Sequence, residues 1–109
     1  MAITYKVLGQ SAPSATTNTD VYTVGSGKQT TISTITLANR GATSTTYRIA
    51  VRPNGATLAN EHYIAYDGAL PANDTVGLTL GMTLAQTDVV SVYASTSTVS
   101  FNLFGSEVS

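Results

Sequence analysis

The chain of 109 residues is long enough for one domain with a single buried core, and the absence of cysteine excludes disulfides, thiolate metal sites and thiol nucleophiles. Five basic and six acidic residues give a net charge of -1, which excludes a general electrostatic attraction to nucleic acid or to an anionic membrane. Only 10% of the residues are charged, against roughly 25% in an ordinary domain, so we expect a neutral surface suited to packing against neighbouring molecules.

Apolar and polar residues alternate along most of the chain, and Gly, Pro, Asn and Asp separate the alternating runs. This pattern predicts antiparallel β-strands with one buried face. The predicted strands span residues 3–8, 21–24, 29–38, 45–52, 62–66, 75–82, 88–95 and 98–104. About eight strands joined by turns favour an all-β fold, a single jelly-roll-like β-sandwich over residues 1–109. The only helical candidate is one turn within residues 56–62.

The first part of the chain is predicted to contain three strands, separated by a polar segment and by a glycine-rich turn. Ile3, Tyr5 and Val7 share one face of the first strand. Residues 9–20 are polar and have no period, which predicts a loop or arm that becomes ordered against a neighbour. GSGK at residues 25–28 is predicted to form a hairpin turn before the third strand.

In the third strand, Ile32 is out of phase with Ile35 and Leu37. A bulge near Ser33 would return all three to one face. The sixth and eighth strands alternate without a break, and their predicted core residues are Val76, Leu78, Leu80, Met82, Val99, Phe101 and Leu103.

The parts of a catalytic or metal site are missing from the sequence. His62 is the only histidine, and we expect it to be half-exposed and hydrogen-bonded at the entrance of a strand. GSGKQT at residues 25–30 has Tyr22 and Gln29 where a phosphate-binding loop needs glycine and Ser or Thr. Scattered carboxylates at predicted turns do not form a calcium loop. We therefore expect no enzyme activity, no cofactor and no metal.

Tyrosines provide the one sequence feature that suits ligand binding. Exposed tyrosines on a β-sandwich can stack on sugar rings, and the candidates are Tyr22, Tyr63, Tyr66 and Tyr93. The absence of tryptophan argues against this function, and tyrosines in a core or an interface would give the same pattern.

Arg48 and Arg52 lie in TYRIAVR, where Tyr47, Ile49 and Val51 are predicted to face the core. Both arginines therefore point outward on the same face, roughly 13 Å apart along the strand. They form either a solvated face or a contact with carboxylates of an adjoining subunit, for which the fork-shaped guanidinium is suited. The interface candidates are Arg48, Arg52, Tyr22, Tyr63 and Tyr66.

Six segments that together cover most of the chain resemble known proteins: ITYKVLGQSAP, LANRGATSTTYRIAVRP, HYIAYD, ANDTVGLTLGMTL, DVVSVYAS and VSFNLFGSEVS. They resemble a family of small structural proteins of tailed bacteriophages, notably phages of cyanobacteria and marine bacteria. The resemblance implies a component of the virion that is made in the cytoplasm of the host bacterium and assembled in many copies. It brings no catalytic motif with it.

The expected function is therefore that of a virion structural protein, an accessory protein that decorates or cements the particle exterior. Its expected partners are other virion proteins and further copies of itself, with no nucleic acid and no membrane. Two alternatives remain open at this point. One is a structural component of the neck, tail or baseplate, and the other is a glycan-binding module for adsorption to the host. The N-terminal segment MAITYKVLGQ lacks the pattern of a signal peptide, which agrees with release into a cytoplasm.

Overall fold

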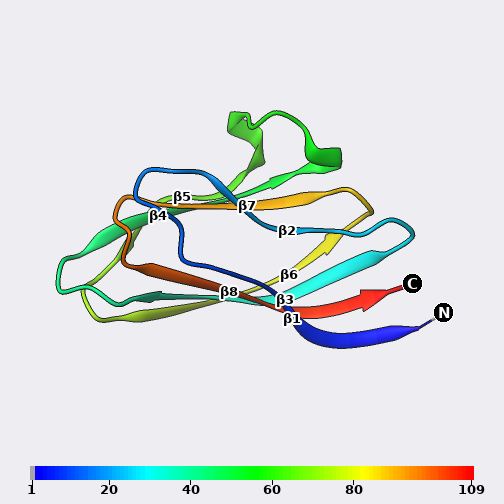
Figure 1. Cartoon of the computed structure of the whole chain (residues 1–109), viewed down its shortest axis with the longest axis horizontal. Coiled ribbons are helices and arrows are strands. Elements are labelled where there is room, and N and C mark those ends of the chain that lie inside the picture. The colour runs from blue at the N-terminus through cyan, green and yellow to red at the C-terminus, as the bar shows by residue number, and fades with distance from the viewer. Residues whose placement is uncertain (1) are drawn as a thin grey trace.

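The computed structural model describes residues 2–109, which form eight β-strands in two facing sheets (Figure 1). The strands are β1 (Ile3–Ser11), β2 (Thr19–Thr23), β3 (Gln29–Asn39), β4 (Thr45–Arg52), β5 (Tyr63–Leu70), β6 (Thr75–Leu84), β7 (Val89–Ala94) and β8 (Val99–Val108). Two short 3-10 turns, η1 (Pro53–Gly55) and η2 (Asn60–His62), lie between β4 and β5. The prediction of an all-β sandwich of about eight antiparallel strands is confirmed.

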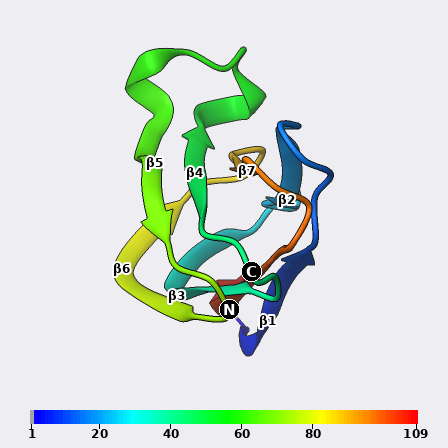
Figure 2. The same ribbon diagram turned by 90° about the vertical axis from the view of Figure 1, so that its left-hand side faces the viewer.

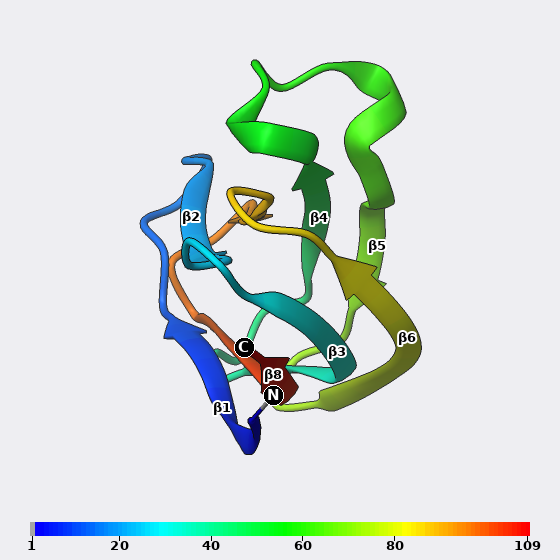
Figure 3. The same cartoon turned by 90° about the vertical axis from the view of Figure 1, so that its right-hand side faces the viewer.

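The strand order is β1-β8-β3-β6 in one sheet and β2-β7-β4-β5 in the other. The pairs β1-β8, β2-β7, β3-β6 and β4-β5 each join a strand to its counterpart from the other end of the chain. The chain is thus a long antiparallel hairpin rolled up on itself, which is the jelly-roll topology. Its two ends lie together, with backbone hydrogen bonds of 3.0 Å between Ala2 and Ser109 in both directions. Its tip is the segment with η1 and η2, which rises above β4 and β5 in Figures 2 and 3.

One hydrophobic core fills the space between the inner faces of the sheets. The first sheet contributes Leu8, Ile32, Ile35, Leu37, Leu84, Val99, Phe101 and Leu103. The second sheet and its flanking residues contribute Tyr22, Val24, Tyr47, Ile49, Leu70, Val90, Val92 and Ala94. Because side chains alternate along a strand, burial of these inner faces leaves the two outer faces free to differ in chemistry.

The Ser33 bulge is confirmed by the register of β3. Ile32 lies opposite Gly105 and Thr34 lies opposite Phe104, so Ser33 is an additional residue in β3. As a result, the three apolar residues of this strand that were out of phase are all fully buried. The bulge therefore corrects the phase of the sequence.

Opposite this bulge, β6 departs from the predicted alternation. Three of its four predicted core residues pack against the core, but Leu80 is 47% exposed. Leu80 and Gly81 together face the single Ser33, and Gly81 has a φ of 62°, which glycine adopts without steric cost. The expectation that Leu80 faces the core is therefore wrong, because the irregularity formed by Leu80 and Gly81 turns this one side chain outward. Leu78 and Met82 on either side of it still pack against the core.

The three apolar residues of β1 share one face, as predicted, but this face is exposed to solvent. Ile3, Tyr5 and Val7 are exposed, Tyr5 to 82%, on the outer side of an edge strand. The register shifts between Val7 and Gly9, and Leu8 at this shift is the residue that β1 buries. Alternation alone defines which residues share a face and leaves open which side that face takes.

The polar segment 9–20 forms a shorter loop than the sequence predicts. Its first three residues complete β1 and its last two belong to β2, which leaves residues 12–18 between the strands. Pro13 is buried, and the Thr16 N–H donates to the Ala94 carbonyl at 2.8 Å. The predicted bounds of this loop or arm are therefore too wide at both ends, because strand pairing continues into them, and its ordering against a neighbour stays a prediction.

The GSGK segment turns as predicted but does not form a hairpin. The Lys28 N–H donates to the Gly25 carbonyl at 3.2 Å, and Gly27 takes a φ of 73°. However, β2 and β3 belong to different sheets, so this turn carries the chain across the sandwich. The hairpin prediction is wrong because neighbouring strands in a jelly roll change sheets, and local turn chemistry does not reveal this.

Gly105 allows a close backbone approach that we expect any side chain to disrupt. A Cβ at this position would collide with the Thr31 carbonyl oxygen on the paired strand β3. We expect Gly105→Ala to destabilise the protein by about 1–3 kcal/mol in urea denaturation, as overpacking does. The control is Gly77→Ala in β6, where no atom lies within 4 Å of the added Cβ and the change should stay below about 0.5 kcal/mol. Equal destabilisation by the two substitutions would contradict the role of this approach.

Candidate functional site

The alternation predicted for β4 is confirmed. Tyr47 and Ile49 are buried, Val51 packs against the core, and Arg48 and Arg52 occupy alternate positions on the outer face of the β2-β7-β4-β5 sheet. The surroundings of the two arginines therefore define what this face can do.

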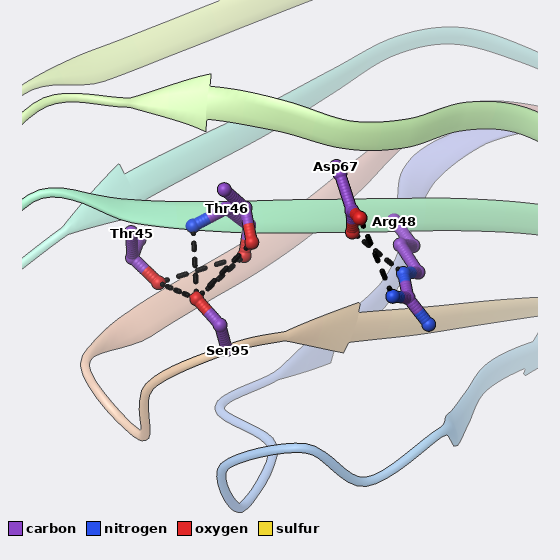
Figure 4. A network of polar contacts seen from close by, with 5 residues as sticks. All are labelled: Thr45, Thr46, Arg48, Asp67 and Ser95. Carbon is purple, nitrogen blue, oxygen red and sulfur yellow. Dashed lines mark hydrogen bonds and ion pairs between the residues drawn. The ribbon is translucent and has the colours of Figure 1, made fainter.

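The Arg48 guanidinium is held between two tyrosine rings and a carboxylate. Its Cζ lies 4.2 Å from the ring centroid of Tyr66 and 4.3 Å from that of Tyr93. Its Nε donates to Asp67 Oδ1 at 2.7 Å and its Nη2 to Oδ2 at 3.4 Å, as Figure 4 shows. The hydrogen bond to Asp67 raises the pKa of Arg48 above its usual value, and the cation–π contacts favour the same charged form.

Tyr66 and Asp67 both reach Arg48 because β5 has a bulge at these residues. The register of β5 against β4 shifts here, so that two residues of β5 face the single Arg48. Asp67 has a φ of 50°, a left-handed conformation that Asp tolerates better than most residues. In a regular strand, consecutive side chains point to opposite faces. The bulge therefore brings a ring and a carboxylate to the same guanidinium.

Tyr63 extends this group along β5. Its ring centroid lies 4.8 Å from that of Tyr66 with an angle of 82° between the planes, an edge-to-face contact. Asn60 in η2 joins the two rings in lining a shallow depression of about 500 Å³. We name the residues around it the tyrosine face: Arg48, Tyr63, Tyr66, Asp67 and Tyr93.

Arg52 connects β4 to two further strands and to the η1 turn. Its Nη2 donates to Asp20 Oδ1 on β2 at 2.7 Å, and its Nε donates to Ser91 Oγ on β7 at 3.1 Å. Its Nη1 donates to the carbonyls of Gly55 and Ala56 at 3.3 and 3.0 Å. With only 17% of its side chain exposed, Arg52 serves as a bridge within the chain.

Both arginines thus have carboxylate partners in their own chain, Asp67 for Arg48 and Asp20 for Arg52. The sequence raised two alternatives, a solvated face and a contact with an adjoining subunit. Neither alternative anticipated these pairs. Their carboxylates come from β2 and β5, the two edge strands of the sheet. These ion pairs within the chain give both arginine side chains a structural role.

Tyr22 does not lie at a surface where a subunit or a sugar could contact it. It is 8% exposed, and its hydroxyl donates to Glu107 Oε2 at 2.6 Å and lies 2.6 Å from Thr30 Oγ1. The other oxygen of Glu107 pairs with Lys6 at 3.1 Å and with Lys28 at 3.6 Å. The choice of Tyr22 as an interface residue is wrong because the inner face of β2 turns it into this network.

The network shifts the pKa values of Glu107 and Tyr22 in opposite directions. The Tyr22 hydrogen bond first, and then the neighbouring lysines, hold the pKa of Glu107 below its usual value although burial opposes this. Burial first, and then the bond to Glu107, raise the pKa of Tyr22 to about 12. The phenol is therefore kept neutral and the carboxyl charged.

At the opposite end of β3, Asn39 closes the sandwich. It is 3% exposed, and its Nδ2 donates to the carbonyls of Thr43 and Pro71 at 2.9 and 3.2 Å. Its Oδ1 accepts from the Gly41 N–H at 3.0 Å and from the Thr98 hydroxyl at 2.8 Å. Near it, the Ser95 hydroxyl joins Thr45 and Thr46 in Figure 4. Asn39 thus holds the loops at this end through neutral hydrogen bonds, to which the Arg40 guanidinium adds bonds to Ser97 and Ser100.

The outer face of the β1-β8-β3-β6 sheet contrasts with the tyrosine face. Lys6 and Glu107 are the only charged residues in these four strands, and they pair with each other at 3.1 Å. By alternation, Lys6 points away from the side of Tyr5 and Val7 and towards buried Glu107, so the outward positions of these strands are uncharged. Only the Lys6 side chain, which is 44% exposed, reaches this surface, at the groove beside Tyr5 and Phe104. We name this surface the uncharged face.

The register shows how the uncharged face is built. Strand by strand from β1 to β6, its rungs are Tyr5-Ser106-Thr31-Thr83, Val7-Phe104-Thr34-Thr79 and Gln10-Asn102-Thr36-Gly77. Threonine therefore dominates β3 and β6, while the large exposed apolar side chains, apart from Leu80 in β6, lie towards β1. Exposed Phe104 and Tyr5 line a shallow groove of about 520 Å³ between them.

His62 has the place that the sequence predicts. It is half-buried at the entrance of β5, and its Nδ1 accepts from the Ala59 N–H at 3.0 Å. Within residues 2–109, no three His, Asp or Glu side chains come together as metal ligands would. No helix in this part of the chain has the length and apolar character needed to cross a bilayer. The absence of enzyme activity stays a prediction.

Sequence reasoning overlooked Glu107, Asp20, Asp67 and Asn60. Glu107 could have been found, since it shares the phase of Phe101 and Leu103 in β8 and thus faces inward. The other three carry no such signal, because a bulge or a distant strand determines what they meet.

Comparison of the chain with protein-family models, with curated proteins and with solved structures found no match. What the chain does is therefore argued from its two outer faces.

We expect Arg52→Ala to destabilise the isolated protein by about 1–3 kcal/mol, because hydrogen bonds from a charged group to two other strands and a turn are lost. Arg40→Ala is the control, since exposed Arg40 contacts only Ser97 and Ser100 through hydrogen bonds in the described chain and should cost less than about 1 kcal/mol. Urea denaturation measures both. A change within about 0.5 kcal/mol of wild type for Arg52→Ala would refute the bridging role.

The Tyr22–Glu107 network predicts a loss of stability at both ends of the pH range. The lowered pKa of Glu107 means that stability present above its ordinary pKa of 4.5 is lost as the pH falls below that value. The raised pKa of Tyr22 means that stability present below pH 10.0 is lost as the pH rises towards about 12. We expect Glu107→Gln to flatten the acid limb and Tyr22→Phe to flatten the alkaline limb of denaturation midpoint against pH.

The control for the acid limb is Glu61→Gln at an exposed position. It should leave the acid limb as steep as in the wild type. A Glu107→Gln protein with an unchanged acid limb would show that Glu107 is not the group responsible.

Proposed function

We propose that the chain is a structural protein of a bacteriophage virion, an accessory protein that decorates or cements the particle exterior. The single observation that carries the proposal is the uncharged face of the β1-β8-β3-β6 sheet. The resemblance of whole strands to phage structural proteins supports it. The jelly roll agrees with it, since viral capsid domains use this topology, but the fold also hosts other functions.

The uncharged face has the dimensions of a specific interface. Strands of about ten residues at ~3.3 Å per residue are about 33 Å long, and four strands spaced by ~4.8 Å are about 19 Å wide. The projected area is thus on the order of 600 Å², and the accessible area of a surface with side chains is larger. A standard interface buries about 800 Å² on each partner, so this sheet face is large enough.

The chemistry of the uncharged face also suits repeated docking. Burying it would affect only one ionised side chain of the strands, Lys6, which is already paired with Glu107, so the desolvation penalty of association is small. Tyr5, Val7 and Phe104 provide exposed apolar contacts, and the threonine rungs provide hydroxyl donors and acceptors. In a symmetric particle every copy repeats the same contacts, so weak individual docking adds up.

Placement on the head is the more specific part of the proposal. A neck, tail or baseplate component would use the same kind of interface in far fewer copies. The copy number per particle therefore separates the two, and quantitative mass spectrometry of purified virions measures it. We expect a copy number that follows that of the shell protein.

The docking role is tested by placing a charge on the uncharged face. Thr31 is exposed in the central strand β3, and Thr31→Glu would bury an unpaired carboxylate on docking. We expect at least about a tenfold loss of occupancy on virions, which corresponds to about 1.4 kcal/mol, and an unchanged thermal midpoint of the isolated protein. Thr79→Glu on β6 is a second variant with the same expectation.

The matched control is Thr23→Glu, an exposed threonine in β2 on the other sheet. It should load as the wild type does. Normal occupancy of both Thr31→Glu and Thr79→Glu would remove the uncharged face from the docking mechanism, and absence of the chain from purified virions would refute the proposed function itself.

A further inference from the structure

The depression beside Asn60 has the composition of a small ligand site. Two tyrosine rings stand at 82° to each other with centroids 4.8 Å apart, and together with Asn60 they line about 500 Å³ of open space. Tyr66 is 58% exposed, although rings of this size are normally buried or partnered. We name these three residues, Asn60, Tyr63 and Tyr66, the corner. The hydrophobic core lies on the other side of the sheet, so core packing does not explain why these side chains lie together at the surface.

The ring of Tyr66 is fixed from behind. The Arg48 guanidinium lies 4.2 Å from its centroid, and the same guanidinium is anchored to Asp67 at 2.7 Å and to the Tyr93 ring at 4.3 Å. The ring therefore cannot turn freely, and little side-chain entropy remains to be lost when a ligand stacks on it. Tyr66 is a preorganised platform.

We propose that this corner binds a neutral saccharide ring, as found in polysaccharides of a cell surface. The apolar C–H side of a sugar ring stacks on the open side of the Tyr66 ring. Its hydroxyls exchange hydrogen bonds with the Asn60 amide and with the hydroxyls of Tyr63 and Tyr66, which can each donate and accept. The three lining residues are all uncharged, so the ligand that matches them carries hydroxyls and no net charge.

The charges around the corner argue against other stacking ligands. A nucleotide brings a phosphate, and the two cations of β4, Arg48 and Arg52, are already paired with Asp67 and Asp20. A quaternary ammonium group prefers the electron-rich side of an aromatic ring. Here the Arg48 cation lies on Tyr66 and opposes a second cation.

The proposed saccharide site is separate from the docking surface. It lies on the β2-β7-β4-β5 sheet, whereas docking uses the β1-β8-β3-β6 sheet on the other side of the core. A copy docked through the uncharged face would therefore present the corner outward. Weak binding by one corner would be multiplied over the copies on a particle.

The experiment titrates the full chain with neutral gluco-, galacto- and manno-oligosaccharides, and follows binding by calorimetry and by NMR of the tyrosine rings. We expect saturable binding of at least one of them with a Kd on the order of 1 mM, as suits so small a contact. Tyr66→Ala should weaken binding at least about tenfold, and Asn60→Ala should weaken it severalfold. Each variant must first show a wild-type thermal midpoint.

Tyr5→Ala is the matched control, because Tyr5 is 82% exposed on the opposite sheet. It should bind as the wild type does. The proposal is overturned if no neutral oligosaccharide binds at tens of millimolar, if folded Asn60→Ala and Tyr66→Ala both bind normally, or if Tyr5→Ala loses binding equally. Preferential binding of a nucleotide or of choline would overturn it as well. Thr31→Glu should retain saccharide binding, so failure of the docking proposal and failure of this one are distinguishable.

Discussion

Burial of two inner sheet faces against each other is the interaction on which the rest of the molecule depends. The chain has no cysteine, so this apolar layer replaces covalent cross-links as the source of stability. Alternation along each strand assigns one side to the core and leaves the other side outside it. The two outer faces therefore differ freely, and one is uncharged while the other carries tyrosines and ion pairs.

Irregular strand positions determine what the regular strands can present. The bulge at Ser33 keeps β3 in phase with the core, and its counterpart in β6 turns Leu80 outward. The bulge at Tyr66 and Asp67 instead changes the outer face, since it brings two consecutive side chains to one arginine. One inserted residue thus protects the fold in the first case and builds a candidate binding corner in the second.

The few charges of this chain are largely used within it. Arg48 pairs with Asp67, Arg52 pairs with Asp20, and Glu107 receives two lysines and a phenol. Such pairs contribute little where water screens them, and removing one partner costs more where strands cover the other, as around Glu107. Their shared consequence is a surface on which shape, hydroxyls and aromatic rings, more than charge, govern recognition.

The sequence by itself determined the strands, most inner faces and the Ser33 bulge, because a period of two residues is a local property that a short window of sequence contains. It also placed Arg48 and Arg52 on the outer face of their strand and His62 at the entrance of β5, although His62 itself belongs to η2. Only the tertiary structure decided that Tyr22 is buried and that Leu80 is exposed. It also decided that Tyr66 and Tyr93 lie against Arg48 and that Tyr63 packs on Tyr66. These outcomes depend on which strands become neighbours. Asp67 is 19 positions from Arg48 and Glu107 is 85 positions from Tyr22, and only the rolled hairpin brings such residues into contact.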